Sequence, residues 1–205
     1  MKLEVVNMGL LGIGVWDWEN VRKHWLPDDP FQPEFRTPSY YKGKAWAAQW
    51  TGAKSICEIG VRAGYSAAAF FQSPVLERYV GIDLNGNDEG GFAGSLEYAK
   101  KVMEANPQID SVLAIGDSQK MSWLPYEGTF DLVHIDGDHS YAGATHDLEL
   151  AIRTRSRWVL IDDFDFISEV RIATMDLMDK YNVNGWYIYD RNYRGSILFE
   201  TPEEK

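Results

Sequence analysis

Between residues 54 and 165, short apolar runs alternate with longer stretches of mixed polarity. Each run holds four to six residues and is almost continuously apolar, which is typical of parallel strands that are buried on both faces of a sheet. The pattern predicts strands at Ser55–Ile59, Tyr79–Ile82, Ser111–Ile115, Phe130–Ile135 and Trp158–Ile161.

The stretches between and after these runs predict helices. In one of them, Ala144 and the apolar residues four, seven and eight positions after it share one helix face. Pro74 and Pro107 stand just beyond two others, where proline commonly stops a helix. The helices are expected at Ser66–Phe71, Ser95–Asn106, Tyr141–Arg153 and Ser168–Tyr181.

The end of the chain has a different pattern. Two apolar runs, Trp186–Tyr189 and Ile197–Phe199, are separated by a stretch that contains Gly195, and this arrangement predicts an antiparallel hairpin. Repeated strand–helix units followed by a hairpin predict an α/β fold. We expect a Rossmann-like doubly wound sheet that is mostly parallel, with a C-terminal antiparallel hairpin.

Residues 1–50 differ in composition from the rest of the chain. They hold five of the eight tryptophans and four of the eight prolines, and proline interrupts both helices and sheet ladders. A helix is expected to resume at Tyr41–Trp50. We predict an irregular cover over residues 1–50 that packs on a Rossmann-like domain formed by residues 51–205.

Composition narrows the class of protein. A chain of 205 residues with 45% hydrophobic residues is expected to form one globular domain. No apolar run reaches the ~18 residues of a membrane span, and the start lacks the basic region of a signal peptide. The net charge of −11 disfavours nucleic acid as a partner. Cys57 is the single cysteine, which excludes an internal disulfide and fits the cytoplasmic location that we expect.

Acidic residues stand at the end of every predicted parallel strand or directly after it. They are Glu58, Asp83, Asp117, Asp136 and the pair Asp162–Asp163. One acid at such a position is ordinary, because aspartate is common in turns and helix caps. Ligands of doubly wound sheets bind at the carboxyl ends of the strands, so five acidic ends in succession favour a ligand site there.

The turn after the first predicted strand carries Gly60 and Gly64, which allow a tight turn and a close approach to a ligand. Ser66 is expected to cap the helix that follows. Asp83 lies 25 residues after Glu58, where an acid binds the ribose hydroxyls of a nucleotide. The Gly-x-Gly-x-x-Gly fingerprint is absent, which disfavours a dehydrogenase that uses NAD.

These residues resemble a known family. Glu-Ile-Gly-x-x-x-Gly followed by Gly-Ile-Asp resembles motif I and the second-strand acid of class I S-adenosylmethionine-dependent methyltransferases. The stretch Phe130–Tyr141 resembles metal-dependent small-molecule O-methyltransferases related to the macrocin and mycinamicin sugar methyltransferases, and more distantly catechol O-methyltransferase. The resemblance covers about residues 54–165. Arg62 departs from the common motif, which has a glycine there.

The resemblance implies a role for each matching residue. Glu58, Gly60 and Gly64, with Ser66 in the same turn, line the methionine part of S-adenosylmethionine, and Arg62 contacts its carboxylate. Asp83 binds the ribose, and Asp117 with Ser118 faces the adenine; Asp136 also belongs to this cofactor-binding set. The acceptor is expected to be a hydroxylated small molecule, such as a sugar or glycosylated metabolite. Formation of a homo-oligomer stays open.

The resemblance also implies a metal and a base. Asp136, Asp162 and Asp163 fall where the family holds a divalent cation, and carboxylates suit Mg²⁺. Asp138 competes as a ligand in the same loop. His139 takes the place of the general base, because an imidazole accepts a proton near neutral pH.

Other histidines have no such role. His134 lies inside a strand and is expected to pack in the core, His146 lies on a helix flank, and His24 lies in the cover. Two other functions stay open for the chain as a whole. One is a hydroxylase-like relative of the same family, and the other is a catalytically silent subunit that binds S-adenosylmethionine.

Overall fold

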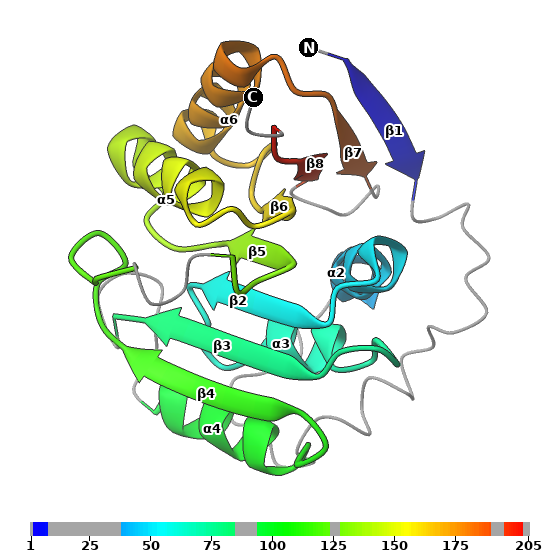
Figure 1. The fold of residues 1–205 in the computed structure, drawn as a ribbon, viewed down its shortest axis with the longest axis vertical. Helices are drawn as coiled ribbons and strands as arrows, with labels where there is room; N and C mark the ends of the chain where they lie inside the picture. Colours follow the sequence, from blue (N-terminus) through cyan, green and yellow to red (C-terminus); the bar gives the residue numbers. More distant parts are fainter. Residues whose placement is uncertain (1, 8–37, 85–93, 124–127, 190–194, 203–205) are drawn as a thin grey trace.

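The computed structural model of the chain describes residues 2–7, 38–84, 94–123, 128–189 and 195–202. Among these residues, eight strands form one sheet in the order β1-β7-β8-β6-β5-β2-β3-β4 (Figure 1). The strands are β1 Leu3–Asn7, β2 Ser55–Ile59, β3 Arg78–Asp83, β4 Asp110–Ile115, β5 Leu132–Ile135, β6 Trp158–Ile161, β7 Gly185–Tyr189 and β8 Ser196–Glu200. The pair β1–β7 and all neighbours from β6 to β4 are parallel, whereas β8 runs antiparallel to both β6 and β7.

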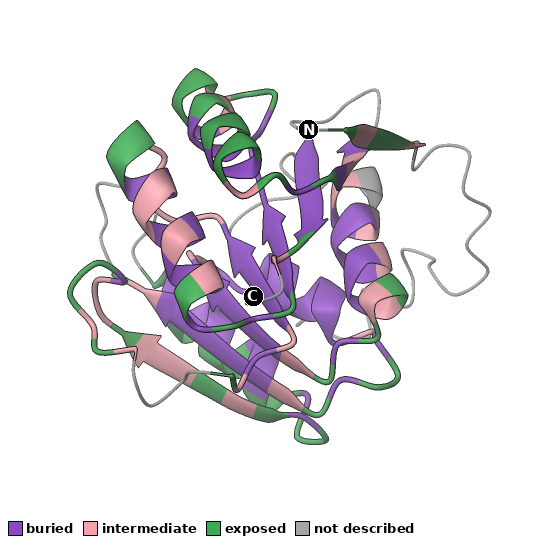
Figure 2. Ribbon diagram, turned by 45° about the horizontal axis from the view of Figure 1, so that its top comes forward, coloured by how far each residue is buried: buried purple, intermediate pink, exposed green. Residues whose placement is uncertain are grey.

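Helices cover both faces of the sheet because successive strand residues point to opposite sides. Ile56 packs with the layer of α2, α3 and α4, while the next residue, Cys57, packs with the layer of α5 and α6. The helices are α2 Pro38–Thr51, α3 Tyr65–Phe70, α4 Ser95–Glu104, α5 Tyr141–Arg153 and α6 Ser168–Tyr181. Figure 2 shows the central strands buried between helices whose outer faces are exposed. None of the described helices is long and apolar enough to cross a membrane.

The predicted α/β class and doubly wound, mostly parallel sheet are confirmed, and the predicted strands and helices differ from the observed ones by at most two residues at an end, except at the start of α2. That helix begins at Pro38, where a proline is tolerated because the first helical N–H needs no partner. Ser66 does not cap α3; the cap position is Gly64, in the left-handed conformation and without a side-chain cap.

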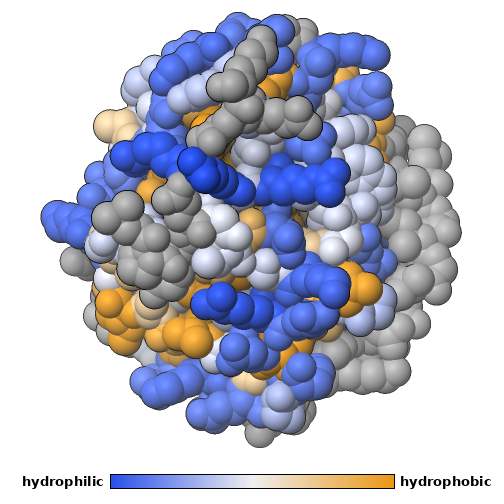
Figure 3. All heavy atoms as spheres, viewed as in Figure 1, coloured by the Kyte–Doolittle hydropathy of each residue, from blue (hydrophilic) through white to orange (hydrophobic). Residues whose placement is uncertain are grey.

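Two strands depart from the expected pattern. β4 is the edge of the sheet and is not buried on both faces, since Val112 is 49% and Ile115 66% exposed. In Figure 3 apolar side chains gather where Figure 1 draws the carboxyl ends of β3 and β4. β1 was not predicted, and it lies beyond the predicted antiparallel hairpin as the other edge. Most of the predicted cover, with His24, falls in residues 8–37, outside the described residues.

The carboxyl ends of β2 and β5 approach each other closely at Gly60. The φ of Gly60 is +91°, and an added Cβ would lie 2.0 Å from the carbonyl oxygen of Asp136. The backbone N–H of Gly60 donates to Ile82 O at 2.9 Å, while that of Asp136 donates to Ile59 O at 2.8 Å. Only glycine fits between the two strands here.

We expect Gly60→Ala to lower the free energy of unfolding by about 3 kcal/mol or more, because the collision is with backbone that has no room to move. Gly52→Ala is the matched control: Gly52 also has a positive φ, +63°, but nothing lies within 4 Å of its added Cβ. Its cost should be about 1 kcal/mol, from the conformation alone. Equal losses in urea denaturation of the two variants would contradict the role given to the close approach.

Candidate active site

A cavity of about 510 Å³ opens at the carboxyl ends of the parallel strands. It lies where the strand order reverses, between β2 and β5, which is where ligands of doubly wound sheets bind. Among the predicted site residues, the lining includes Gly60, Arg62, Asp83, Asp117, Ser118, Asp136, His139 and Asp163. The sheet therefore brings eight of them together.

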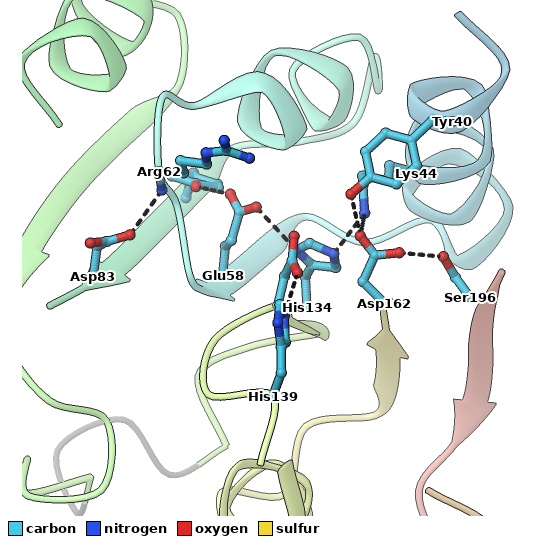
Figure 4. A network of polar contacts seen from close by, with 11 residues as sticks. Tyr40, Lys44, Glu58, Arg62, Asp83, His134, His139, Asp162 and Ser196 are labelled. Carbon is cyan, nitrogen blue, oxygen red and sulfur yellow. Dashed lines mark hydrogen bonds and ion pairs between the residues drawn. The ribbon is translucent and has the colours of Figure 1, made fainter. Parts of the chain in front are cut away.

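The loop after β2 shapes one wall of this cavity. Arg62 has a positive φ of +53°, unusual for a residue with a side chain, and its backbone N–H donates to Asp83 Oδ2 at 2.8 Å (Figure 4). This hydrogen bond ties the loop to the end of β3 and fixes the Asp83 carboxylate at the cavity. Asp163, on the far side, also has a positive φ of +55°. Such strained residues concentrate at functional sites.

The ends of β4 and the following turn form a second wall. Asp117 accepts from the backbone N–H of Gln119 and pairs with Lys120 at 2.6 Å, and these contacts lower its pKa. The Ser118 hydroxyl donates to Asp147 Oδ1 at 2.9 Å. Asp147, on α5, is fully buried, and burial raises the pKa of its carboxyl group. Its Oδ2 has no hydrogen-bond partner in the described structure.

Three side chains that can bind a cation converge at the ends of β5 and β6. A carboxylate oxygen of Asp136, one of Asp163 and a ring nitrogen of His139 all lie within 4.8 Å of one another. His139 Nε2 is 3.2 Å from Asp136 Oδ1 and 3.7 Å from Asp163 Oδ2. The hydrogen bond to Asp136 raises the pKa of His139, burial opposes this, and the charges of Asp136, Asp163 and Asp162 add to the rise.

Asp162, also a predicted metal ligand, lies close to Asp136 but does not line the cavity. Its carboxylate is buried away from the cavity and pairs with Lys44 Nζ at 2.5 Å. Ser196 Oγ donates to Asp162 Oδ1 at 2.8 Å, and the Tyr40 hydroxyl donates to Oδ2. Three donors thus hold the Asp162 carboxylate, and its role as a metal ligand with Asp136 and Asp163 stays a prediction. Asp138, the competing ligand, accepts from Ser140 N and Gln119 Nε2.

Glu58 also turns away from the cavity. Its carboxylate is fully buried, accepts from the Tyr79 hydroxyl and lies 3.0 Å from His134 Nδ1. His134 is buried as expected, but it belongs to a polar network and not to a purely apolar core. Gly64 and Ser66 do not line the cavity either, among the described residues; they shape the start of α3.

Sequence reasoning missed Tyr40 and Lys44. Both lie on α2, and Tyr40 lines the cavity while Lys44 is only 1% exposed. A lysine is rarely fully buried and a tyrosine is intermediate, so only the burial of α2 against the sheet reveals them. Cys57 and His146 behave as expected. Cys57 is buried, which raises the pKa of its thiol, and His146 lies on α5 beside Asp147.

The sequence of this central region identifies the family. Residues 57–164 match the family described as a methyltransferase domain, and this segment is more than half of the chain. The chain therefore belongs to that methyltransferase domain family. No curated protein sequence matches it significantly.

Solved structures share the fold. The SAH-bound methyltransferase PaMTH1 of Podospora anserina has a TM-score of 0.61 and 14% identity, covering 90% of this chain and 88% of that chain. The O-methyltransferase of Bacillus cereus in complex with SAH has a TM-score of 0.60 and 16% identity, covering 92% and 93%. TomG of Streptomyces achromogenes, an O-methyltransferase in complex with SAM, has a TM-score of 0.59 and 21% identity, covering 93% and 92%. The predicted class I methyltransferase fold is thus confirmed.

The contact between Ser118 and Asp147 gives a prediction with a defined pH dependence. The pKa of Asp147 is higher in the folded than in the unfolded chain. The free energy of unfolding therefore falls as pH rises from the unfolded pKa through the folded pKa, because ionisation of the buried carboxyl group opposes folding. Ser118→Ala removes a donor to the carboxylate and raises the folded pKa further. We expect a loss of about 1.5–3 kcal/mol at pH 7 that shrinks at about pH 3, below the ordinary pKa of an aspartate, where the carboxyl group is protonated in both states.

Ser73→Ala is the matched control for this change. Ser73 is equally a buried serine, but its hydroxyl has no hydrogen-bond partner in the described structure. Its replacement should change stability little at either pH. Urea denaturation at both pH values measures the difference, and a Ser118→Ala loss that does not depend on pH would contradict the assignment to Asp147.

Proposed function

We propose that this chain transfers a methyl group from S-adenosylmethionine to a hydroxyl group of a small molecule, with help from a divalent cation and His139. One observation carries the proposal. A single cavity holds an acidic strand end suited to a ribose, Asp83, and, across from it, the cluster of Asp136, His139 and Asp163. Cofactor and acceptor sites are thereby adjacent, as group transfer requires.

The proposed cofactor side uses the walls formed by β2, β3 and β4. The Asp83 carboxylate, already oriented by the Arg62 backbone, accepts the ribose hydroxyls in this assignment. The Arg62 side chain lines the same cavity and supplies a positive charge for the carboxylate of the cofactor. Asp117 and Ser118 remain for the adenine.

The proposed acceptor side uses Asp136 and Asp163. Two carboxylates beside an imidazole, within 4.8 Å of one another and facing a cavity, are a donor set that fits a hard divalent cation with room for water or a hydroxyl. A bound cation would lower the pKa of an acceptor hydroxyl and orient it. Asp162 takes no part in this set, since Lys44 already holds it.

His139 then handles the proton. A carboxylate only accepts hydrogen bonds, so the Nε2–H of His139 donates to Asp136, which leaves Nδ1 as the nitrogen that accepts the hydroxyl proton. The acceptor oxygen forms a bond to the methyl carbon as the carbon–sulfur bond breaks, and the proton passes to His139. Asp136 keeps the ring oriented throughout.

The acceptor is proposed as a hydroxylated small molecule. TomG, one of the similar structures, is described as involved in tomaymycin synthesis, which supports a metabolite and not a macromolecule. The net charge of −11 disfavours a nucleic acid. A sugar hydroxyl stays the first choice for screening.

Calorimetric titration of the full chain with S-adenosylmethionine, with and without Mg²⁺, tests the proposal, followed by a screen of hydroxylated acceptors. We expect cofactor binding in both conditions, turnover that a chelator abolishes, and recovery on addition of Mg²⁺. Absence of S-adenosylmethionine binding rejects the function as a whole. Full turnover in excess chelator rejects the metal alone.

Asp83→Ala should weaken S-adenosylmethionine binding by about 1.5–3 kcal/mol, or about 10- to 150-fold, because charge-assisted hydrogen bonds to the ribose are lost. Asp83→Asn retains an oxygen acceptor for the backbone N–H of Arg62 but removes the negative charge. Its affinity for S-adenosylmethionine therefore distinguishes the effect of the charge from the effect of the loop geometry. Asp110→Ala, at the exposed opposite end of the neighbouring strand β4, is the control. Unchanged affinity in a folded Asp83→Ala variant would move the cofactor away from β3.

His139→Gln should lower kcat by about 10²–10⁴-fold, because glutamine forms hydrogen bonds but takes no proton at neutral pH. Affinities for S-adenosylmethionine and for Mn²⁺ should change little. His146→Gln is the matched control, because His146 is a partly exposed histidine of α5 that does not line the cavity. A kcat near that of the parent rules out His139 as the base, and a parallel loss of Mn²⁺ affinity would make it a metal ligand.

A further inference from the structure

Behind the cavity lies a second group of ionisable side chains that the proposed reaction does not use. Lys44, Glu58, His134 and Asp162 come from α2, β2, β5 and the end of β6, and each is at most 2% exposed (Figure 4). Lys44 Nζ lies 2.5 Å from Asp162 Oδ2 and 3.0 Å from His134 Nε2. Its ammonium also lies 4.4 Å from the centre of the Tyr40 ring.

The hydrogen bonds of this group have one consistent direction. A lysine ammonium only donates, so His134 Nε2 accepts from Lys44, and His134 Nδ1–H donates to Glu58 Oε1. The Tyr79 hydroxyl donates to the other Glu58 oxygen. Asp162 accepts from Lys44 and two hydroxyls. Asp162 thus contacts the buried ammonium directly, and Glu58 is linked to it through the His134 ring.

The position of this ammonium is informative. Ligand atoms of His134, Asp136 and Asp162 lie within 4.8 Å of one another, which makes them a second set able to hold a cation. This set shares Asp136 with the cavity-facing set of Asp136, His139 and Asp163. The Lys44 ammonium contacts two of the three inner ligands, so it already supplies positive charge where a metal ion would bind.

A tethered cation has an advantage over one in solution. The side chain of Lys44 is delivered by the packing of α2, so its high local concentration does not depend on the metal supply. Removing one member of a buried ion pair leaves an uncompensated charge, and the pair therefore resists displacement. A free divalent ion competes poorly for Asp162 while Lys44 is present.

We propose that Lys44 is the resident cation of the inner ligand set, and that it restricts an exchangeable divalent ion to the outer carboxylates, Asp136 and Asp163. This inference rests on the proposed function only for the outer metal. Lys44 is a positioning residue, because it holds Asp162 and His134. Asp162 directly precedes Asp163, and His134 lies two residues before Asp136. It also determines how many carboxylates a metal can use.

Mn²⁺ binding to the full chain without S-adenosylmethionine or acceptor tests the proposal by calorimetry. We compare the unaltered chain, Asp162→Asn, Lys44→Met and the double variant. Asp162→Asn alone should leave the dissociation constant within about threefold, because Asp162 is not a ligand while Lys44 is present. Lys44→Met should bind Mn²⁺ about tenfold more tightly or better, because Asp162 becomes a further ligand.

The double variant separates ligand release from a simple charge effect. If Lys44 acts only through its charge, Asp162→Asn has the same effect in both backgrounds. If Lys44 blocks the inner set, Asp162→Asn abolishes the gain in the Lys44→Met background and does little in the unaltered chain. Lys42→Met, the same change two residues away on α2, should not alter Mn²⁺ binding.

Several results would overturn the proposal. One is an unaltered Mn²⁺ dissociation constant in a folded Lys44→Met variant, and another is equal effects of Asp162→Asn in both backgrounds. If Lys44→Met does not fold, a tenfold or larger loss of Mn²⁺ affinity in Asp162→Asn alone still refutes it. No Mn²⁺ binding to the unaltered chain at millimolar concentration refutes the outer site. S-adenosylmethionine binding is measured separately, so loss of the proposed function gives a different result.

Discussion

The fold gathers negative charge at one edge of the sheet, and the structure has to compensate for it. Five strand ends bring acidic side chains to the same region, where like charges raise one another's energy. The backbone N–H of Arg62 compensates Asp83, and Lys44 with two hydroxyls compensates Asp162. Asp136 and Asp163 have His139 between them. The carboxylates that line the cavity face a ligand, while the carboxylates buried behind it are paired with side chains of the protein.

Much of this arrangement is readable from the sequence. Apolar runs predict the parallel strands because both of their faces are buried, and topology then places Asp83, Asp117 and Asp136 at one edge without knowledge of any side-chain contact. The expectation of burial on both faces failed for β4, because it is an edge strand. Its residues are as apolar as those of central strands, but it has a neighbouring strand on one side only. β1 was not predicted because five residues of mixed polarity give no clear period.

Side-chain direction is what the sequence could not supply. Glu58 and Asp162 both stand at strand ends, as Asp83 and Asp163 do, yet they point into the protein and the others into the cavity. Asp162 and Asp163 are adjacent just beyond β6, yet only Asp163, whose backbone φ is +55°, lines the cavity. Their partners, Tyr79, His134 and Lys44, lie 21 to 118 residues away along the chain, beyond any local motif.

Helix α2 lies outside the segment that matches the methyltransferase family, residues 57–164, and Ser196 lies beyond its other end. The buried ion pair beside the methyltransferase domain therefore depends partly on residues of flanking elements. Replacement of the turn of α2 that carries Tyr40 and Lys44 would change the charge around Asp162 without any change in the shared domain. Chains with this fold can therefore differ in the cation that they bind because of residues in a helix outside the shared segment. A comparison of the shared motifs alone would miss such a difference.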